Sequence, residues 1–375
     1  MIKHYFDWTA TTPVLQNALD EYCRISSEFI GNPSSVHSEG IRAKSKLNEL
    51  RKRTAAAIGS EPDEIFFTSG GTESDSIIMN SPLTQPVPGH IITTGIEHSA
   101  VLEHKKTLEN HGWIVTSLNC PSGYINPAQL EKNLNSKTKL VCIMAVNNVT
   151  GTVQPITECV DIIRNFEKNN GRKIHIHCDA VQALGKTEFC LKNLDIDSAA
   201  FSSHKFGGPR GIGILFNRNK SINSLSKGGG QEYGLRPGTE NLPAIAAMVT
   251  ALESSLSGFE ENYSTVMHFR RIVEDAVLEK GYTLLSPSCA SSNRFSPYII
   301  TFSVKPTPSE VYIRMMDDKG FCMSSGSACS SNSRGKAESV LSAMNIDPLN
   351  RMSAIRVSLS QLNTEQEVKE LAKEL

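Results

Sequence analysis

The sequence lacks any pair of cysteines at C-x-x-C spacing, although it contains nine cysteines. These thiols are scattered, which argues against a disulfide framework and against a zinc site built from protein ligands alone. His175 and His177 share one face of a predicted strand, but no third ligand follows at a metal-binding spacing. We therefore interpret both histidines as structural and expect no metal site.

Long apolar runs and an excess of either charge are also missing. No segment is apolar over the length needed to span a bilayer, and the first residues show no signal-peptide core. We therefore expect a cytoplasmic protein without membrane contact. The chain has 38 Lys and Arg against 39 Asp and Glu, a net charge of −1. Without a strong field, direct binding to nucleic acid is not expected.

The remaining composition is that of a globular protein, with 39% hydrophobic and 21% charged residues. A chain of 375 residues can bury a large core and form two domains. We predict a larger domain over residues 15–255. A smaller domain is predicted from residues 1–14 and 256–375, entered by one long helix that starts at Leu242 and runs to about His268.

Strand-like and helix-like segments alternate through the first two thirds of the chain. This pattern predicts an α/β fold with a mostly parallel sheet and helices on both faces. Ligands of such sheets bind at the carboxyl ends of the strands. The predicted strands cover residues 65–68, 91–94, 113–118, 138–145, 173–178, 197–201 and 212–216.

Two of these strands are followed by groups suited to one cofactor. Asp179 ends the strand 173–178, and Lys205 follows the strand 197–201 in a turn that continues as Phe206-Gly207-Gly208. Lysine can form a Schiff base with a carbonyl compound. Pyridoxal phosphate needs such a lysine and a carboxylate that keeps its ring nitrogen protonated. Taken alone, Lys205 would be interpreted as a solvated surface lysine; Asp179 favours the cofactor.

The same cofactor requires a phosphate site, and residues 66–74 supply one. The sequence here predicts a strand at Phe66-Phe67-Thr68, a turn at Ser69-Gly70-Gly71 and the start of a helix at Thr72-Glu73-Ser74. Backbone N–H groups and the helix dipole at such a start favour a dianion.

A third segment, residues 322–331, is small and polar with Cys329 in its middle. Its low hydrophobicity predicts an exposed, mobile loop, and Arg334 and Lys336 follow it. A thiol near cationic groups can be a reactive thiolate. The alternative is an incidental surface cysteine.

Residues 228–241 form a glycine-rich segment that is either a flexible linker or, as its Arg, Glu and Asn suggest, an ordered loop that contacts a partner.

With these motifs in place, the chain resembles the cysteine desulfurases of the class V aminotransferase family, which are pyridoxal phosphate enzymes on a fold-type I scaffold. The similarity runs from Asp7 to Arg356, and its motifs are residues 31–37, 68–74, 203–208, 235–241 and 324–330. The resemblance implies a mostly parallel sheet of the seven-stranded type, with helices on both faces, and a smaller α+β domain towards the C-terminus.

The resemblance also implies a role for each matching residue. Lys205 would carry the cofactor, Cys329 would accept the sulfur, and His98 would stack on the ring and carry a proton. Thr239 would reach the phosphate of a neighbouring subunit's cofactor, which implies a homodimer. Gly71 and Thr72 would hold the phosphate, helped by Ser203 and His204, and Asp179 would pair with the ring nitrogen. Asn148 and Gln182 would contact the ring's 3′ oxygen region or the substrate. Arg356 would bind the substrate carboxylate, with Asn32 nearby.

Some positions have a plainer interpretation or depart from the family. His98 could merely begin a helix, and Gln182 could be a surface residue of a helix. Val149 stands where the family usually has an acidic residue, and Trp8-Thr9 replaces an aromatic-alanine pair. Arg334-Gly335-Lys336 replaces an apolar-acidic-proline step, so the identity of the docking sulfur acceptor is not settled by the motif.

The resulting hypothesis is a cysteine desulfurase that converts L-cysteine to L-alanine and leaves a persulfide on Cys329. An iron–sulfur scaffold, a tRNA-thiolation protein or a cofactor pathway would then receive the sulfur. The alternatives are a selenocysteine lyase or another class V aminotransferase, neither of which needs Cys329. A non-enzymatic scaffold that delivers sulfur or iron is a further alternative.

Overall fold

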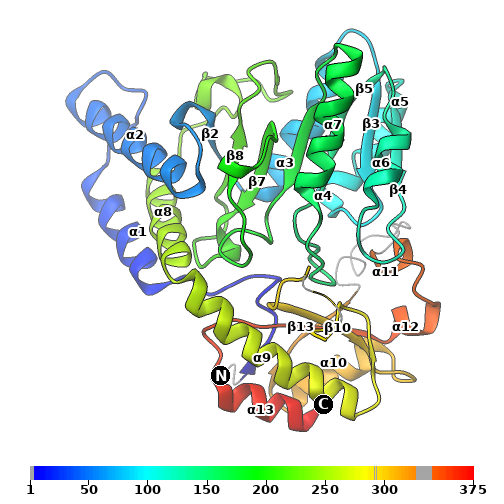
Figure 1. Ribbon diagram of the computed structural model, residues 1–375. Coiled ribbons are helices and arrows are strands. Elements are labelled where there is room, and N and C mark those ends of the chain that lie inside the picture. Colours follow the sequence, from blue (N-terminus) through cyan, green and yellow to red (C-terminus); the bar gives the residue numbers. More distant parts are fainter. Residues whose placement is uncertain (1–3, 291, 293, 327–339) are drawn as a thin grey trace.

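A computed structural model describes residues 4–290, 292, 294–326 and 340–375 (Figure 1). Its larger part is built on a sheet of seven strands in the order β2-β8-β7-β6-β5-β3-β4. Strands β3 to β7 run parallel, and β8 runs antiparallel to both of its neighbours. The strands are β2 (Ile65–Thr68), β3 (His90–Thr94), β4 (Ile114–Leu118), β5 (Thr138–Cys142), β6 (His175–Asp179), β7 (Ser198–Ser202) and β8 (Gly213–Asn217).

Alternate residues of these strands serve two separate hydrophobic clusters. Ile92, Val141 and Ile214 pack with α7 (Ile156–Asn170) and α8 (Leu242–Ser257), whereas their neighbours Ile91, Leu140 and Leu215 pack with α3 (Gly71–Asn80). Successive side chains of a strand point to opposite faces, so helices cover both faces of the sheet. The predicted mostly parallel α/β architecture is confirmed.

The remaining elements of this part surround the sheet. Helices α1 (Gln16–Glu28) and α2 (Ser38–Ile58) pack on α8 and project from one side of the molecule (Figure 1). The shorter helices are α4 (Ser99–Leu102), α5 (Lys105–Asn110) and α6 (Pro127–Asn133). Short 3₁₀ turns are η1 (Pro62–Glu64), η2 (Ser81–Thr84), η3 (Leu191–Asn193), η4 (Ser203–Lys205) and η5 (Glu232–Gly234).

The smaller part has an antiparallel sheet in the order β12-β13-β10-β9 and its own hydrophobic cluster. Phe6 belongs to this cluster, and β1 pairs with β11, so the N-terminal arm packs with the C-terminal third of the chain. The strands are β1 (His4–Tyr5), β9 (Thr283–Leu284), β10 (Ile299–Ser303), β11 (Phe321–Cys322), β12 (Ser324–Ser325) and β13 (Ala354–Ser358). The helices are α9 (Phe259–Glu279), α10 (Ser309–Asp318), α11 (Val340–Ala343), α12 (Pro348–Met352) and α13 (Glu365–Glu374).

The prediction of a single continuous helix from Leu242 is wrong. The structure breaks it at Gly258 into α8 and α9, which are bent by 71° relative to each other. Glycine has low helix propensity and is a common position for a sharp bend. Among the described residues, no single helix has the length and apolar character to cross a membrane, and only this bent pair, taken as one, meets those two criteria.

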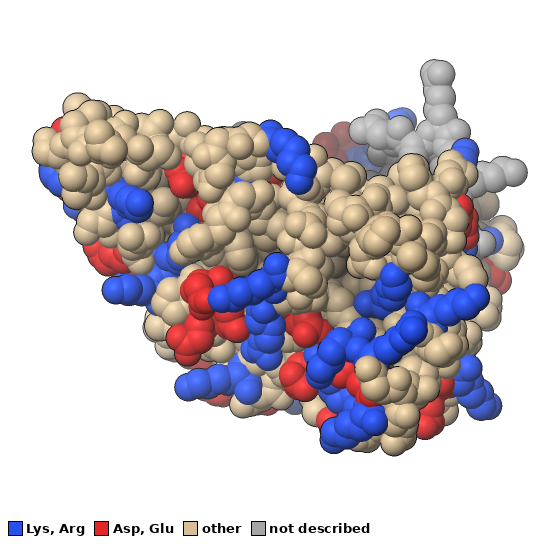
Figure 2. Space-filling view, turned by 90° about the horizontal axis from the view of Figure 1, so that it is seen from above, with Lys and Arg blue, Asp and Glu red and all other residues tan. Residues whose placement is uncertain are grey.

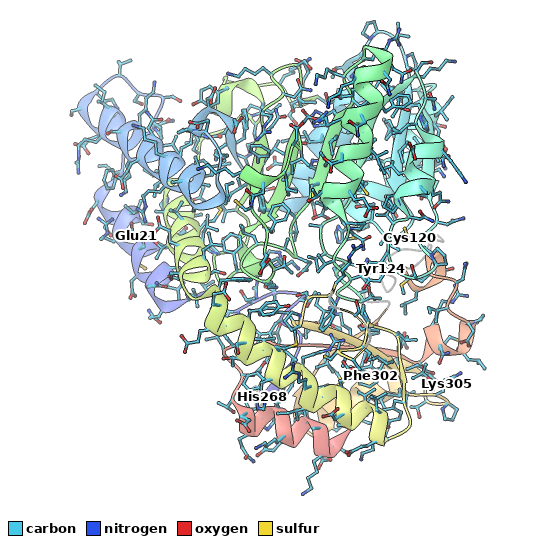
Figure 3. All side chains as sticks on the ribbon, in the orientation of Figure 1. Glu21, Cys120, Tyr124, His268, Phe302 and Lys305 are labelled. Carbon is cyan, nitrogen blue, oxygen red and sulfur yellow. The ribbon has the colours of Figure 1, made fainter. Side chains whose placement is uncertain are left out.

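Contacts between the two parts frame the carboxyl edge of the large sheet. Tyr124, labelled in Figure 3, lies after β4, and its hydroxyl donates to the carbonyl of Arg294 at 2.8 Å. On the other side, Thr12 donates from its backbone and its hydroxyl to the carbonyl of His204, each at 3.0 Å. The N-terminal arm is therefore bound to the turn that carries Lys205.

Candidate functional site

A cavity of about 340 Å³ lies at the carboxyl edge of the large sheet. Its lining comes from the N-terminal arm, the start of α3, the segments after β3, β5, β6 and β7, and strand β13. These elements are far apart in sequence, and the parallel sheet brings their ends together. The lining residues are Thr9, Ala10, Gly71, Thr72, Asp75, His98, Met144, Val146, Asn148, Asp179, Val181, Gln182, Ser202, His204, Lys205 and Arg356.

Lys205 is held at the cavity by the N-terminal arm. It ends the turn η4 after β7, and its Nζ donates to the carbonyls of Thr9 and Ala10 at 2.7 and 2.8 Å. Both acceptors are backbone groups, so they orient the amine without neutralising it. A carbonyl ligand in the cavity would meet a lysine that is already positioned.

Asp179 ends the neighbouring strand β6, where Asp179 is opposite Ala200 of β7. It is 5% exposed, and burial raises the pKa of its carboxyl, while the charges of His98 and Lys205 and the N–H of Val181 act in the opposite direction. Val181 donates this hydrogen bond at 3.0 Å. A buried carboxylate at a ligand cavity is suited to hold a protonated ring nitrogen.

The start of α3 is shaped for close approach by an anion. A Cβ at Gly71 would lie 2.5 Å from Cγ2 of Val181, so this position has no room for a side chain. Thr72 is exposed at the cavity, and Ser202 lines it from β7. Backbone N–H groups, a threonine and a serine at a helix N-terminus fit a phosphate.

Arg356 enters the cavity from β13 and is 4% exposed. Its Nη2 forms an ion pair with Asp7 at 2.9 Å, and its Nη1 donates to the carbonyl of Asn148 at 3.0 Å. The buried Nε of Arg356 and Oδ1 of Asn148 have no hydrogen-bond partner within the described residues. Buried polar atoms without partners are costly, so both atoms are suited to a ligand.

His98 and Gln182 are also oriented by the protein. His98 caps α4, and its Nδ1 accepts the N–H of Ala100 at 3.1 Å. Gln182 donates from Nε2 to the carbonyl of Thr9 at 3.2 Å, and its Oε1 accepts from Lys186 at 3.4 Å. Lys186 is buried, and burial lowers the pKa of its amine to about 7.

The structure does not bring all the predicted residues to this cavity. Ser203 is fully buried behind the lining, and its Oγ has no partner within the described part of the chain. Thr239 is exposed away from the cavity, and Asn32 is exposed in the loop between α1 and α2, where its Oδ1 accepts the N–H of Ser34 at 2.9 Å. Cys329 lies outside the described residues.

Sequence reasoning missed several residues that line or support the cavity. Thr9 and Ala10 act through backbone carbonyls, which leave no trace in residue type. Asp75 lies four residues after Gly71, one helical turn along α3, and this spacing could have indicated its position. Asp7 was part of the resemblance, but its ion pair with Arg356 joins chain positions that no local pattern connects.

Taken together, these residues fit pyridoxal phosphate. The cavity contains an amine, a buried carboxylate, a helix start without room for a side chain and a buried guanidinium with an unpartnered nitrogen. Each has a counterpart on the cofactor or on an amino-acid substrate.

Comparison with known proteins gives the family. The model of the family "Aminotransferase class-V" matches residues 4–371. A NifS/IcsS protein homolog of Lactobacillus delbrueckii subsp. bulgaricus is 39% identical over 98% of this chain and 94% of the relative. A cysteine desulfurase IscS of Methanosarcina thermophila is 36% identical over 97% of this chain and 89% of the relative. A solved NifS-like protein matches with a TM-score of 0.90 at 34% identity, covering 99% of this chain and 97% of that one. The chain therefore belongs to the class-V aminotransferase family, and its relatives there include cysteine desulfurases of the NifS and IscS kind.

Proposed function

We propose that the protein is a cysteine desulfurase, which removes sulfur from L-cysteine and forms L-alanine. The observation that carries this function is the placement of Lys205, Asp179 and Arg356 around one cavity in a chain whose relatives are named for this activity. An amine, a ring-binding carboxylate and a carboxylate-binding guanidinium are the groups that an amino-acid enzyme using pyridoxal phosphate needs.

The cofactor would be held by Lys205, by Asp179 at its ring nitrogen, and by Gly71 and Thr72 at its phosphate, with Ser203 and His204 helping from the turn η4. His98 would stack on the ring, and Gln182 and Asn148 would contact its 3′ oxygen region or the substrate. When bound, pyridoxal phosphate supplies an electron sink for the bonds at the amino-acid Cα.

The chain's own residues then bind the substrate and move its protons. Arg356, held by Asp7, binds the carboxylate of L-cysteine. Lys205 Nζ accepts the proton from Cα, a general-base role suited to an amine. His98 carries a proton near the substrate sulfur.

The sulfur step is assigned to Cys329. Its thiolate attacks the substrate sulfur, so an S–S bond forms while the Cβ–S bond breaks; the electron pair stays with Cβ, which takes up a proton to give alanine. The N–H of Gly326 donates to the carbonyl of Ala354 at 2.8 Å, on the strand that carries Arg356. Cys329 follows Gly326 by three positions in the sequence, and the attachment of Gly326 to this strand supports the assignment.

The quaternary structure proposed is a homodimer. Thr239 lies outside the cavity of its own chain, as expected if it serves the site of a second subunit. The projection formed by α1 and α2 appears in Figure 2 as a mostly uncharged lobe. It exposes the large apolar side chains of Leu19, Tyr22, Ile30, Val36 and Ile41. Exposed apolar side chains of this size commonly mark a protein interface.

Further proposals complete the assignment. The division into residues 15–255 and residues 1–14 with 256–375 is supported by one hydrophobic cluster whose members all belong to the second set, and by the bend at Gly258. The persulfide of Cys329 would pass to an acceptor protein for iron–sulfur clusters, thio-cofactors or tRNA thiolation. Location in the cytoplasm stays a prediction from the sequence.

The decisive experiment measures alanine and sulfide released from L-cysteine by the purified, cofactor-loaded protein. We expect both products from the wild type and a loss of sulfur transfer in Cys329→Ser. Full activity of Cys329→Ser would remove this thiol from the mechanism and favour a selenocysteine lyase. A colourless protein that retains no pyridoxal phosphate would favour the non-enzymatic scaffold.

A further inference from the structure

One buried amide joins two of the segments that line the cavity. Asn147 follows β5, directly before Asn148, and its side chain is fully buried. Its Nδ2 donates to the carbonyl of Ile96 at 3.0 Å, in the loop between β3 and α4 that carries His98. Asn147 does not itself line the cavity, so it acts on the chemistry only through these neighbours.

The same amide closes the turn of residues 147–151, which carries Asn148. Its Oδ1 accepts the N–H groups of Val149 and Thr150, each at 2.9 Å, and the hydroxyl of Thr150 at 3.1 Å. The N–H of Gly151 donates to the carbonyl of Asn147 at 2.9 Å, and Gly151 has a φ of 75°, which glycine adopts without strain. Because Oδ1 faces donors and Nδ2 faces a carbonyl, the orientation of the amide is fixed.

On its other side, this turn contacts the smaller part of the molecule. Nη1 of Arg356 on β13 donates to the carbonyl of Asn148 at 3.0 Å. Thr301 of β10 is opposite Arg356 in the antiparallel ladder, and its hydroxyl donates to the carbonyl of Val149. The turn therefore lies between the guanidinium of Arg356 and the loop of His98, and it is hydrogen-bonded to both sides.

The loop between β3 and α4 has a second link to the segment after β5. Oε1 of Glu97 accepts the hydroxyl of Thr94 at 2.7 Å and the N–H of Met144 at 3.0 Å. Met144 precedes the turn, and its Sδ lies 3.4 Å from Nδ2 of Asn147. Glu97 thus fixes the beginning of the segment, whereas the bond from Asn147 to Ile96 reaches the turn itself.

We infer that Asn147 is a positioning residue for the reaction: it holds the loop of His98 and the turn of Asn148 in one fixed arrangement, and through the carbonyl of Asn148 it keeps Arg356 in register with His98. The inference rests on the proposed function, in which His98 carries a proton and Arg356 binds the substrate carboxylate. The hydrogen bonds of Asn147 are properties of the protein alone and can be tested without the reaction.

Two substitutions separate the two bonding roles of this amide. Asn147→Ser keeps an oxygen that can accept the N–H of Val149, as serine does in many turns, but its shorter side chain does not reach the carbonyl of Ile96. Asn147→Ala removes both contacts. The first variant should therefore release only the loop, whereas the second should release the loop and the turn. Asn147→Ser, which keeps the turn, is also the variant that should preserve the fold.

Asn217 provides a matched control at the opposite edge of the large sheet. It is 5% exposed, its Oδ1 accepts the N–H of Asn219 at 3.2 Å, and its Nδ2 donates to the carbonyl of the same residue at 3.1 Å. It ends β8 opposite Ser198, the first residue of β7, whereas the cavity lies at the other end of β7. Asn217→Ser and Asn217→Ala remove comparable bonds there and control for a general loss of stability.

Amide hydrogen exchange of the purified full-length protein tests the links. In Asn147→Ser we expect the amides of residues 97–102 to exchange roughly tenfold faster than in the wild type, because the buried carbonyl of Ile96 loses its partner. The amides of residues 148–151 should change little in this variant and should exchange faster in Asn147→Ala. Neither Asn217 variant should affect these two segments. Unchanged exchange of residues 97–102 in both Asn147 variants overturns the inference.

Steady-state kinetics test whether the links position the catalytic groups. Asn147→Ser should lower kcat for L-cysteine roughly tenfold or more, since a displacement of about 1 Å has effects of this size, and should leave KM within about twofold. Asn147→Ala should also raise KM, because the carbonyl that holds Arg356 moves. The Asn217 variants should lower the free energy of unfolding without this division.

The two outcomes are separable. If the kinetic constants of the Asn147 variants equalled those of the Asn217 variants, Asn147 would be a structural residue and the positioning role would be overturned. If the wild type released no alanine from L-cysteine, the proposed function would fail, while hydrogen exchange would still decide whether Asn147 links the loop to the turn.

Discussion

Replacement of Arg356 by lysine is the sharpest test of the substrate assignment. In the structure, Nη2 of the guanidinium pairs with Asp7 and Nη1 donates to the carbonyl of Asn148. Its Nε is buried and has no hydrogen-bond partner among the described residues. A lysine ammonium is a compact charge without this fork, so it cannot hold both protein partners and a substrate carboxylate in the same geometry. Cysteine should therefore lose its anchor while the cofactor site stays intact.

The expected size follows from the bonds lost. A hydrogen bond to a charged group contributes about 1.5–3 kcal/mol, which corresponds to roughly 10- to 150-fold in binding. We expect KM for L-cysteine to rise by about this factor in Arg356→Lys, with a smaller change in kcat. Asp7→Asn, which removes the negative charge of the partner but keeps an oxygen for Nη2, should raise KM by a smaller factor.

The assay is alanine formation against cysteine concentration, with cofactor content measured for every variant. Cysteamine, which lacks the carboxylate, is the control substrate. Wild type and Arg356→Lys should process cysteamine equally poorly, because the group that Arg356 recognises is missing. If Arg356→Lys left KM for cysteine unchanged, or lost activity equally on both substrates, Arg356 would not be the carboxylate anchor.

Three further predictions concern the cofactor, the core and pH. Lys205→Ala should retain no pyridoxal phosphate after borohydride reduction and denaturation, and retention of label would move the attachment elsewhere. Glu232→Gln, which breaks the buried ion pair with Arg51 at 2.6 Å, should lower the free energy of unfolding by about 3–5 kcal/mol in urea titrations, whereas a change below about 1 kcal/mol would show that the pair is dispensable. Burial lowers the pKa of Lys186 to about 7 in the folded protein, against 10.5 for an ordinary lysine. Between pH 7 and pH 10.5 the unfolded chain therefore binds one proton more than the folded protein, so the free energy of unfolding should rise with pH. Urea titrations from pH 7 to pH 10 should show this rise in the wild type and a flatter profile in Lys186→Met; parallel profiles would contradict it.

Much of the fold could be read from residue patterns. The continuous apolar strands and the intervening helices predict a parallel sheet, because strands covered on both faces carry few polar residues. The capping box at Thr364 and Glu367 marks the start of α13, where each side chain bonds the other's backbone N–H. These features are local, and local chemistry is what a single sequence displays.

The placement of Lys205 and Asp179 at one cavity could also be predicted, because each lies at the end of a strand and the carboxyl ends of parallel strands meet at one edge. The partners of Arg356 could not. Asp7 and Asn148 reach it only because β1 joins the smaller part and the segment after β5 faces β13, contacts between residues that are more than 200 positions apart.

The histidines of β6 show the same division. Their alternation with apolar residues indicates a strand and a structural role, and the chain alone says no more. Folding places Ser198 between them and brings Asp75 to one end and Asn219 to the other, so that each ring is hydrogen-bonded at both of its nitrogens. Residue type and spacing reveal which groups a strand presents, whereas their partners depend on which strands and helices become neighbours, and that depends on packing across the whole molecule.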